Sequence, residues 1–255
     1  MRIALIGRGR LATNLLPALL KAGHDVTSVN SRTLEELPAD ADVYIISVKD
    51  SALQEVIAKV SAFSLKPSAL MVHTAGSMPM SLFEGHGQHY GVFYPMQTFS
   101  KERLVDFKEI PVFIEANDAE TLGVLRVLAD SVSQKVYELS TEDRKHLHLA
   151  AVFACNFANH CYALSADVLE RKGLPFDVML PLIDETARKV HELHPLDAQT
   201  GPAVRYDENV IRMQADLCPT PLMKQLYQQM SLSIHEKATE PHDQLRLTED
   251  KSHRV

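Results

Sequence analysis

Short apolar runs alternate with amphipathic segments along the first 140 residues of the chain. Apolar residues at helical spacing predict helices over 10–23, 50–63 and 118–133. The continuous apolar runs are typical of strands that are buried on both faces of a sheet, and they occur at 2–6, 25–29, 42–48, 68–73, 90–94, 110–116 and 135–139. Strands with intervening helices indicate an α/β fold with a doubly wound, mostly parallel sheet.

The pattern changes near residue 140, and beyond it the sequence predicts helices alone. One helical run extends from Thr141 to Gly173. Its middle is apolar nearly all the way round, which predicts burial in a domain core or in an oligomer interface. Further helices are expected at 175–191, 207–216 and 220–237, and the polar stretch 240–255 is expected to fray. We therefore expect an α/β domain over 1–140 and an all-helical domain over 141–255.

Composition narrows the class of protein. The 255 residues are 45% hydrophobic and 23% charged, as in ordinary globular proteins, and the formal net charge is -7. This negative charge argues against nucleic acid or an anionic membrane as a partner. The three cysteines form no C-x-x-C motif, and neither a signal peptide nor a membrane-spanning stretch is visible. We expect a cytoplasmic protein with reduced thiols and no membrane partner.

A glycine pattern follows the first apolar run. Gly7-Arg8-Gly9-Arg10-Leu11-Ala12 has the G-x-G-x-x-A spacing that binds dinucleotides when it connects a strand to a helix. Gly7 permits the tight turn, and Gly9 lets a pyrophosphate approach the backbone. The helix N-terminus offers unpaired N–H groups to the anion. We expect residues 7–11 to bind dinucleotide phosphates in a Rossmann-type domain; a turn that merely contains glycine is the alternative.

The end of the second strand indicates which dinucleotide is bound. An NAD site usually has an acidic residue there, about 20 residues beyond the glycines, to bind the ribose 2′-hydroxyl. Here the strand ends in Asn30, Ser31 and Arg32. A guanidinium beside a hydroxyl suits a 2′-phosphate, whereas the alternative is a solvated surface arginine. We therefore expect NADP as the cofactor.

Three further strand ends carry candidate site residues, because a doubly wound sheet binds ligands at the carboxyl ends of its strands. His73 is a candidate proton donor or else a hydrogen-bonded structural histidine. Tyr94 closes the next strand and is expected to orient the substrate. The residues expected to border the cofactor at these ends are Ser47, Val48, Lys49 and Thr74.

Polar side chains interrupt the apolar part of the long helix. His148, Val152, Cys155 and Asn159 lie at helical spacing on one face, and Asn156 lies on the neighbouring stripe. Such polar groups either satisfy one another or contact a ligand. We expect His148 to be a second candidate proton donor, with Asn156 and Asn159 as orienting groups.

Metal binding is not expected, although the chain has 12 histidines. The spacings His146-x-His148 and His191-x-x-His194 are weak metal signals, and no H-E-x-x-H motif is present.

The stretches "IGRGRLA", "NSRT" and "SVKD", followed by a long helix, resemble the superfamily of 6-phosphogluconate dehydrogenase, β-hydroxyacid dehydrogenases, ketopantoate reductase and pyrroline-5-carboxylate reductase. More closely, "HLAAVFACNFANH", "GVFYPMQTFS" and "TGPAVRYD" resemble a bacterial family of NADP oxidoreductases. That family pairs a Rossmann half, similar to deazaflavin-dependent NADP reductases, with a helical domain of unassigned function. The resemblance implies NADP(H) binding and a homodimer through the helical halves.

The resemblance does not extend to a known catalytic residue. β-Hydroxyacid dehydrogenases have a catalytic lysine one turn before an asparagine on the long helix. The corresponding positions before Asn156 and Asn159 are Val152 and Cys155. We therefore expect an NADP(H)-dependent oxidoreductase that transfers hydride to or from a small carbonyl, imine or alcohol. The alternatives are a non-catalytic NADP-binding sensor or assembly protein, and a deazaflavin- or flavin-linked NADP reductase.

Overall fold

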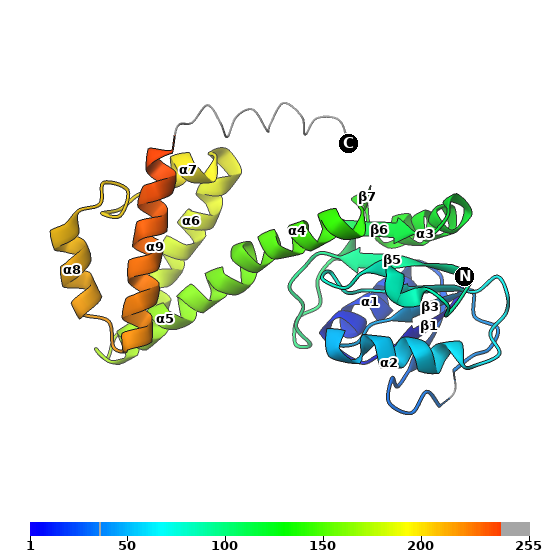
Figure 1. Ribbon diagram of the computed structural model, residues 1–255. Helices are drawn as coiled ribbons and strands as arrows, with labels where there is room; N and C mark the ends of the chain where they lie inside the picture. The colour runs from blue at the N-terminus through cyan, green and yellow to red at the C-terminus, as the bar shows by residue number, and fades with distance from the viewer. Residues whose placement is uncertain (36, 241–255) are drawn as a thin grey trace. The chain divides into compact units, whose positions relative to one another are not determined.

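The protein consists of two compact units, seen in a computed structural model that describes residues 1–35 and 37–240 (Figure 1). Unit 1 spans Met1–Phe157 and unit 2 begins at Ala158. The helical run that starts at Thr141 thus contributes its first turns to unit 1, and the expected domain boundary near residue 140 stays a prediction. The polar stretch that was expected to fray lies, from residue 241 onward, outside the described residues.

Unit 1 is built on one seven-stranded sheet with the order β2-β1-β3-β4-β5-β6-β7. Neighbouring strands are parallel except β5 and β6. The winding reverses between β1 and β3, which is the place where such sheets bind ligands. All seven predicted strands are confirmed: β1 (Arg2–Ile6), β2 (Asp25–Val29), β3 (Val43–Ile46), β4 (Leu70–His73), β5 (His89–Pro95), β6 (Val112–Ala116) and β7 (Val136–Glu138).

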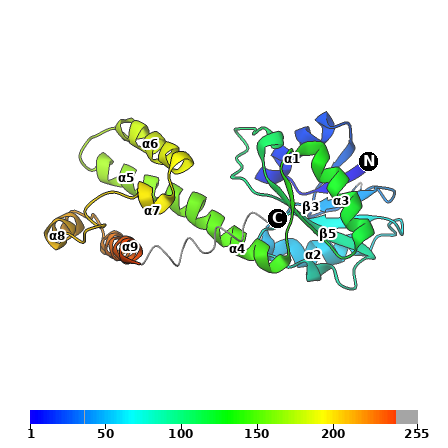
Figure 2. The same ribbon diagram turned by 90° about the horizontal axis from the view of Figure 1, so that it is seen from above.

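Helices cover both faces of this sheet. α1 (Arg10–Lys21) and α3 (Ala119–Val132) lie on one face, and α2 (Asp50–Ser61) lies on the other (Figure 2). Successive strand residues point to opposite faces. Leu5 therefore packs in the core beneath α1 and α3, and Ile6 packs in the core beneath α2. Burial of both faces explains why the strands are continuous apolar runs in the sequence.

The predicted long helix is present but is not a regular α-helix throughout. It consists of α4 (Thr141–Ala151), a π-helical segment (Val152–Phe157) and α5 (Ala158–Glu170). The Ser140 side chain caps its start by accepting from the Asp143 N–H. The π-helical turns are wider than α-helical ones, so they rotate the residues that follow relative to those that precede.

Unit 2 is helical, as predicted. After α5 come α6 (Leu180–Glu192), α7 (Pro195–Ala198), α8 (Glu208–Asp216) and α9 (Pro221–Thr239), and the part of unit 2 that the structure describes contains no strand. No helix within residues 1–35 and 37–240 is long and apolar enough to cross a membrane.

The middle of the long helix is not buried within this chain. Neither the π-helical segment nor α5, both fully described, contains a buried residue. Phe153 is 63% exposed and Phe157 is 50% exposed. The expectation of burial in the chain's own core is therefore wrong, and burial in an oligomer interface stays a prediction.

Candidate functional site

A cavity of about 1080 Å³ lies in unit 1 at the carboxyl ends of the parallel strands, and we call it the strand-end cavity. Each strand from β1 to β4 ends at this edge, because the four strands are parallel. The structure brings together here all twelve residues that were expected to bind the cofactor: Gly7, Arg8, Gly9, Arg10, Leu11, Asn30, Ser31, Arg32, Ser47, Val48, Lys49 and Thr74. Their role in binding stays a prediction.

The two glycines of the motif differ in what they permit. Gly7 has φ +122°, and a Cβ atom there would lie 2.0 Å from the Ser47 carbonyl oxygen at the end of β3. Glycine is therefore required for the close approach of two backbones as well as for the turn. Gly9 has open space around its Cβ position and immediately precedes α1. The first turn of α1 has no acidic residue and no side-chain cap, so its N–H groups remain available to an anion.

The strand-end cavity is rich in positive charge. Its lining includes Arg8, Arg10 and Arg32, and within the described residues no carboxylate pairs with any of the three. Asn30 shapes the turn after β2 by accepting the Arg32 N–H at 3.0 Å. Unpaired guanidinium groups around an open cavity bind phosphate by charge-assisted hydrogen bonds. The cavity therefore fits a ligand with several phosphate groups.

Tyr94 and His148 face each other at the same cavity. The Tyr94 hydroxyl lies 3.0 Å from His148 Nδ1, and the two rings meet edge to face. Gly76 lies against both rings: a Cβ atom there would be 2.5 Å from His148 Nδ1 and 2.8 Å from Tyr94 Cζ. Burial raises the pKa of the Tyr94 hydroxyl, and the Arg144 charge opposes this rise. The pair can therefore hold and pass a proton between two named atoms.

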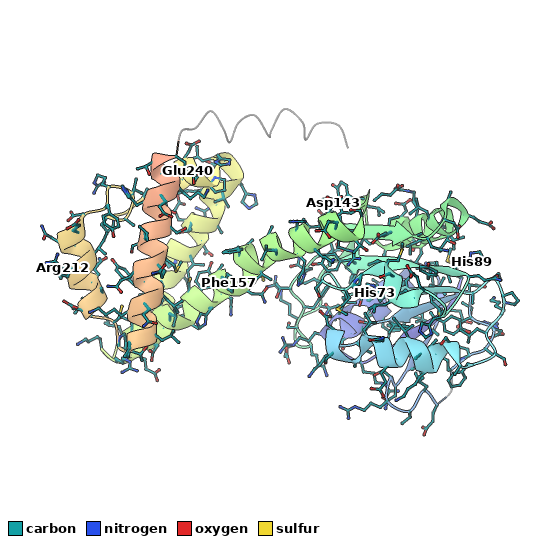
Figure 3. The ribbon with its side chains drawn as sticks, in the orientation of Figure 1. His73, His89, Asp143, Phe157, Arg212 and Glu240 are labelled. Atoms are coloured by element: carbon teal, nitrogen blue, oxygen red, sulfur yellow. The ribbon has the colours of Figure 1, made fainter. Side chains whose placement is uncertain are left out.

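His73 is placed differently from His148. Its side chain is fully buried inside unit 1 and does not line the strand-end cavity (Figure 3). Its Nδ1 accepts the Ala75 N–H at 3.2 Å, its Nε2 lies 3.4 Å from the Pro79 carbonyl oxygen, and its ring stacks on Phe83. Burial, with a smaller contribution from the Arg144 charge, lowers the pKa of His73 to about 4. This is the environment of a hydrogen-bonded structural histidine.

The two asparagines expected on the site do not line this cavity. Asn156 and Asn159 are both exposed in the described chain. The expectation that His148 and Asn159 share a helix face assumed a continuous α-helix, whereas a π-helical segment lies between them and rotates Asn159 relative to His148. No pattern in the sequence marks that segment.

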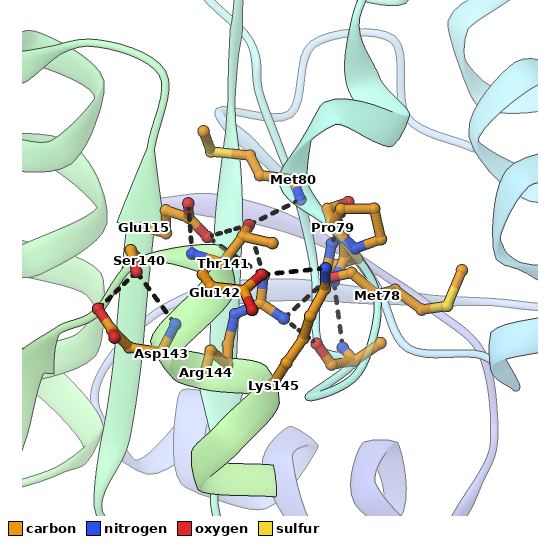
Figure 4. A network of polar contacts seen from close by, with 12 residues as sticks. Met78, Pro79, Met80, Glu115, Ser140, Thr141, Glu142, Asp143, Arg144 and Lys145 are labelled. Carbon is orange, nitrogen blue, oxygen red and sulfur yellow. Dashed lines mark hydrogen bonds and ion pairs between the residues drawn. The ribbon is translucent and has the colours of Figure 1, made fainter. Parts of the chain in front are cut away.

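Sequence reasoning missed a buried polar network beside the cavity (Figure 4). The Arg144 side chain is 1% exposed and contacts Glu115, which is 16% exposed, at 3.1 Å. Arg144 also donates to the carbonyl groups of Ala75, Gly76 and Met78. The one sequence signal was an arginine one turn before His148 on a helix whose middle is apolar. The other lining residues that sequence reasoning did not list are Asp50, Ala52, Glu55, Val56, Lys59, Ala75, Gly76 and Lys101.

In the part of the chain that the structure describes, no group of three His, Cys, Asp or Glu side chains comes together to bind a metal ion.

Comparisons with known proteins agree with this geometry. Residues 2–71 match the family described as "NADP oxidoreductase coenzyme F420-dependent", and residues 110–234 match a domain of unknown function, DUF2520. The crystal structure of a "putative NADP oxidoreductase" from Bacteroides fragilis shares 53% identity, covers 92% of this chain and 98% of its own, and gives a TM-score of 0.86. The chain belongs to this NADP oxidoreductase family.

More distant structures share the fold of this NADP oxidoreductase. An imine reductase from Myxococcus stipitatus, in complex with NADP+, is 14% identical with a TM-score of 0.64, covering 94% of this chain and 93% of its own. A 1-pyrroline-5-carboxylate reductase from Streptococcus pyogenes is 16% identical with a TM-score of 0.60, covering 92% and 98%. A search of the curated proteins found no match.

The two family matches cover different parts of the site of the NADP oxidoreductase, and residues 72–109, which include Thr74, Gly76 and Tyr94, lie in neither match. The glycine motif and the Asn30–Arg32 turn lie within the N-terminal match, whereas Glu115, Arg144 and His148 lie within the domain of unknown function. No family description thus assigns a role to Tyr94 or to His148.

The buried His73 predicts how stability depends on pH. Its folded pKa of about 4 lies below the value of 6.5 that an unperturbed histidine has. Between these values the unfolded chain binds a proton that the folded chain does not. The contribution of His73 to stability is therefore greatest above pH 6.5 and falls as the pH decreases toward 4, by up to ~3 kcal/mol.

Urea unfolding at a series of pH values measures this dependence. His73→Gln should flatten the slope between pH 4 and 6.5. His146→Gln, which removes an exposed histidine of α4, should leave the slope as in wild type. An unchanged slope in His73→Gln would show that His73 is not the titrating group.

Proposed function

We propose that the protein is an NADP(H)-dependent reductase that transfers hydride to the C=O or C=N group of a small substrate, or in reverse from the corresponding alcohol or amine. The observation that carries this proposal is the placement of the Tyr94–His148 pair at the cavity that holds all twelve expected cofactor residues. One cavity thus combines a phosphate-binding end and a proton-holding end.

The residues present fit NADP. Gly9 and the first turn of α1 receive the pyrophosphate, since the backbone there is open and unpaired. Ser31 and Arg32 receive the 2′-phosphate, because Arg32 has no carboxylate partner among the described residues. When bound, the cofactor supplies the hydride. The protein must orient the substrate, exclude water and supply a proton.

The Tyr94–His148 pair supplies that proton. The Tyr94 hydroxyl donates it to the substrate atom that becomes electron-rich. His148 Nδ1–H then donates to the phenolate oxygen while His148 Nε2 takes up a proton from solvent, so that the imidazole stays neutral. His148 is half-buried whereas Tyr94 is 8% exposed, so His148 exchanges protons with solvent more readily than Tyr94 does. His73 takes no part, because it is buried outside the cavity and holds its proton weakly.

We also propose that the protein is a homodimer whose helical parts cover each other. Unit 2 buries few side chains in the described chain, and no residue of α6 is buried. Leu182 on α6 is 63% exposed. An isolated unit of this size needs a buried core to be stable, and a second copy offers an equally apolar surface. A cytoplasmic location, supported by three cysteines that are free of disulfides, completes this proposal.

Arg32 should determine the preference for NADPH. Removal of its charge in Arg32→Ala should raise the Kd for NADPH by roughly 10- to 100-fold and leave the Kd for NADH nearly unchanged, because only NADPH has the 2′-phosphate. Titration of cofactor fluorescence measures both constants. Arg126→Ala, at an exposed pair on α3 outside the cavity, is the matched control. Equal losses for the two cofactors in Arg32→Ala would contradict this role.

The proton-donating pair should affect turnover rather than cofactor binding. A panel containing a cyclic imine (2-methyl-1-pyrroline), a 2-oxo acid (pyruvate), an aldehyde and a reduced or oxidised deazaflavin first identifies an accepted substrate by NADPH absorbance. Tyr94→Phe and His148→Gln should then each lower kcat by roughly 100-fold, with the NADPH Kd within about threefold of wild type. Retained kcat in both variants would exclude the pair, and absence of turnover on every class would favour the sensor alternative.

The helical surface should control association. Light scattering after gel filtration should give a mass twice the 28.5 kDa of one chain. Leu182→Lys places a charge in the proposed apolar contact and should shift the mass toward one chain. Glu192→Gln makes the same change in charge at an exposed polar position of α6 and should not. A wild-type mass of 28.5 kDa would exclude the dimer.

A further inference from the structure

We propose that the buried Arg144–Glu115 ion pair positions the Tyr94–His148 pair, so that Arg144 is a positioning residue for proton delivery. That Arg144 serves proton delivery rests on the proposed function. That Arg144 holds the two rings in place rests only on contacts within unit 1.

Arg144 connects three segments that are distant in the sequence. Its Nη1 donates to the carbonyl oxygens of Ala75, Gly76 and Met78 at 2.9, 2.9 and 2.8 Å. Its Nη2 donates to Glu115 Oε2 on β6 and to the Thr141 hydroxyl, both at 3.1 Å. The loop after β4, the strand β6 and the start of α4 are therefore held by one planar guanidinium, whose rigid fork suits several acceptors at once.

Thr141 completes the network at the first residue of α4. Glu115 accepts both its N–H, at 2.8 Å, and its hydroxyl, at 2.7 Å, and the same hydroxyl accepts the Met80 N–H at 3.2 Å (Figure 4). These contacts fix where α4 begins on the sheet. They also fix the rotation of α4 about its axis.

The position of α4 determines where His148 lies. Arg144 and His148 are one turn apart on α4 and so lie on one face of the helix. While Arg144 holds the Gly76 carbonyl, His148 lies directly against Gly76 and bonds to Tyr94. A Cβ atom on Gly76 would collide with both rings, so the loop after β4 packs directly against the Tyr94 and His148 side chains. Movement of Arg144 must therefore change the Tyr94–His148 contact.

Stability alone does not account for this pair. Replacement of a buried ion pair by apolar groups is often neutral or stabilising. In addition, Arg144 Nε is buried and has no hydrogen-bond partner among the described residues, which is a cost that folded proteins usually avoid. Arg144 thus keeps a buried charge that stability alone does not explain, next to Tyr94 and His148. This placement fits a positioning role.

The test uses the full chain without cofactor, with tyrosine ring carbons and histidine ring nitrogens labelled for NMR. Tyr94 and His148 are assigned by the signals lost in Tyr94→Phe and His148→Gln. Arg144→Lys keeps the charge but replaces the planar fork by one ammonium. We expect its His148 Nδ1 signal to move toward the position seen in Tyr94→Phe, because the hydrogen bond between the two rings is lost.

Glu115→Gln keeps the shape of the side chain and removes its charge. Arg144 then acts on Tyr94 uncompensated, so the Tyr94 ring should titrate at a pH lower than in wild type by roughly half a unit or more. Glu138→Gln, which breaks an exposed pair with Arg126 in the same unit, is the matched control and should leave both signals unchanged. A structural role without positioning would not produce these two separate shifts.

Thr141→Ala, paired with Thr141→Ser, tests the network if either larger change prevents folding. Thr141→Ala should displace the His148 signal and Thr141→Ser should restore it. On a substrate accepted by the wild type, Arg144→Lys should lower kcat at least roughly tenfold and change the NADPH Kd less than about threefold. Wild-type His148 and Tyr94 signals in every folded variant would overturn the proposal. Absence of turnover in wild type would instead count against the proposed function and leave the NMR result to decide.

Discussion

A buried positive charge organises the proposed reactive end of this protein. The Arg144 guanidinium is almost completely removed from water, which is tolerable only because Glu115 compensates its charge and four further oxygens accept its protons. Each of those acceptors is thereby held in place. The loop after β4, strand β6 and helix α4 meet at this one side chain, so the location of His148 above Gly76 depends on it.

The proposed phosphate-binding end depends on a different constraint, the close approach of two backbone segments. Gly7 lies so close to the end of β3 that no side chain fits, and the chain then turns directly into the uncapped start of α1. This geometry needs no distant side chain, only the Ser47 backbone at the end of the neighbouring strand β3. The proposed cofactor end is thus formed by backbone contacts and by residues that directly follow strand ends, whereas the proposed reactive end depends on side-chain contacts between segments that lie as much as 69 residues apart.

This difference explains what the sequence could predict. The seven strands were visible because both faces of the sheet are buried, and the twelve cavity residues were visible because each follows a strand end of known direction. Arg144 and Glu115 were missed because a contact between a helix and an antiparallel strand leaves no spacing to recognise. The rotation of Asn159 relative to His148 was missed for a related reason, since no sequence period marks the π-helical segment between them.

His73 and His148, the two histidines predicted as proton donors, differ in burial and therefore in the roles that they can have. His73 and Arg144 hold the loop after β4 from two sides: His73 accepts the Ala75 N–H, and Arg144 donates to the Ala75 carbonyl. With both backbone groups of Ala75 engaged by buried side chains, this loop has few alternative conformations. Gly76 is therefore a rigid surface for the pair formed by His148 and Tyr94. One histidine makes the surface rigid by staying neutral and buried, whereas the other is only partly buried and lines the cavity.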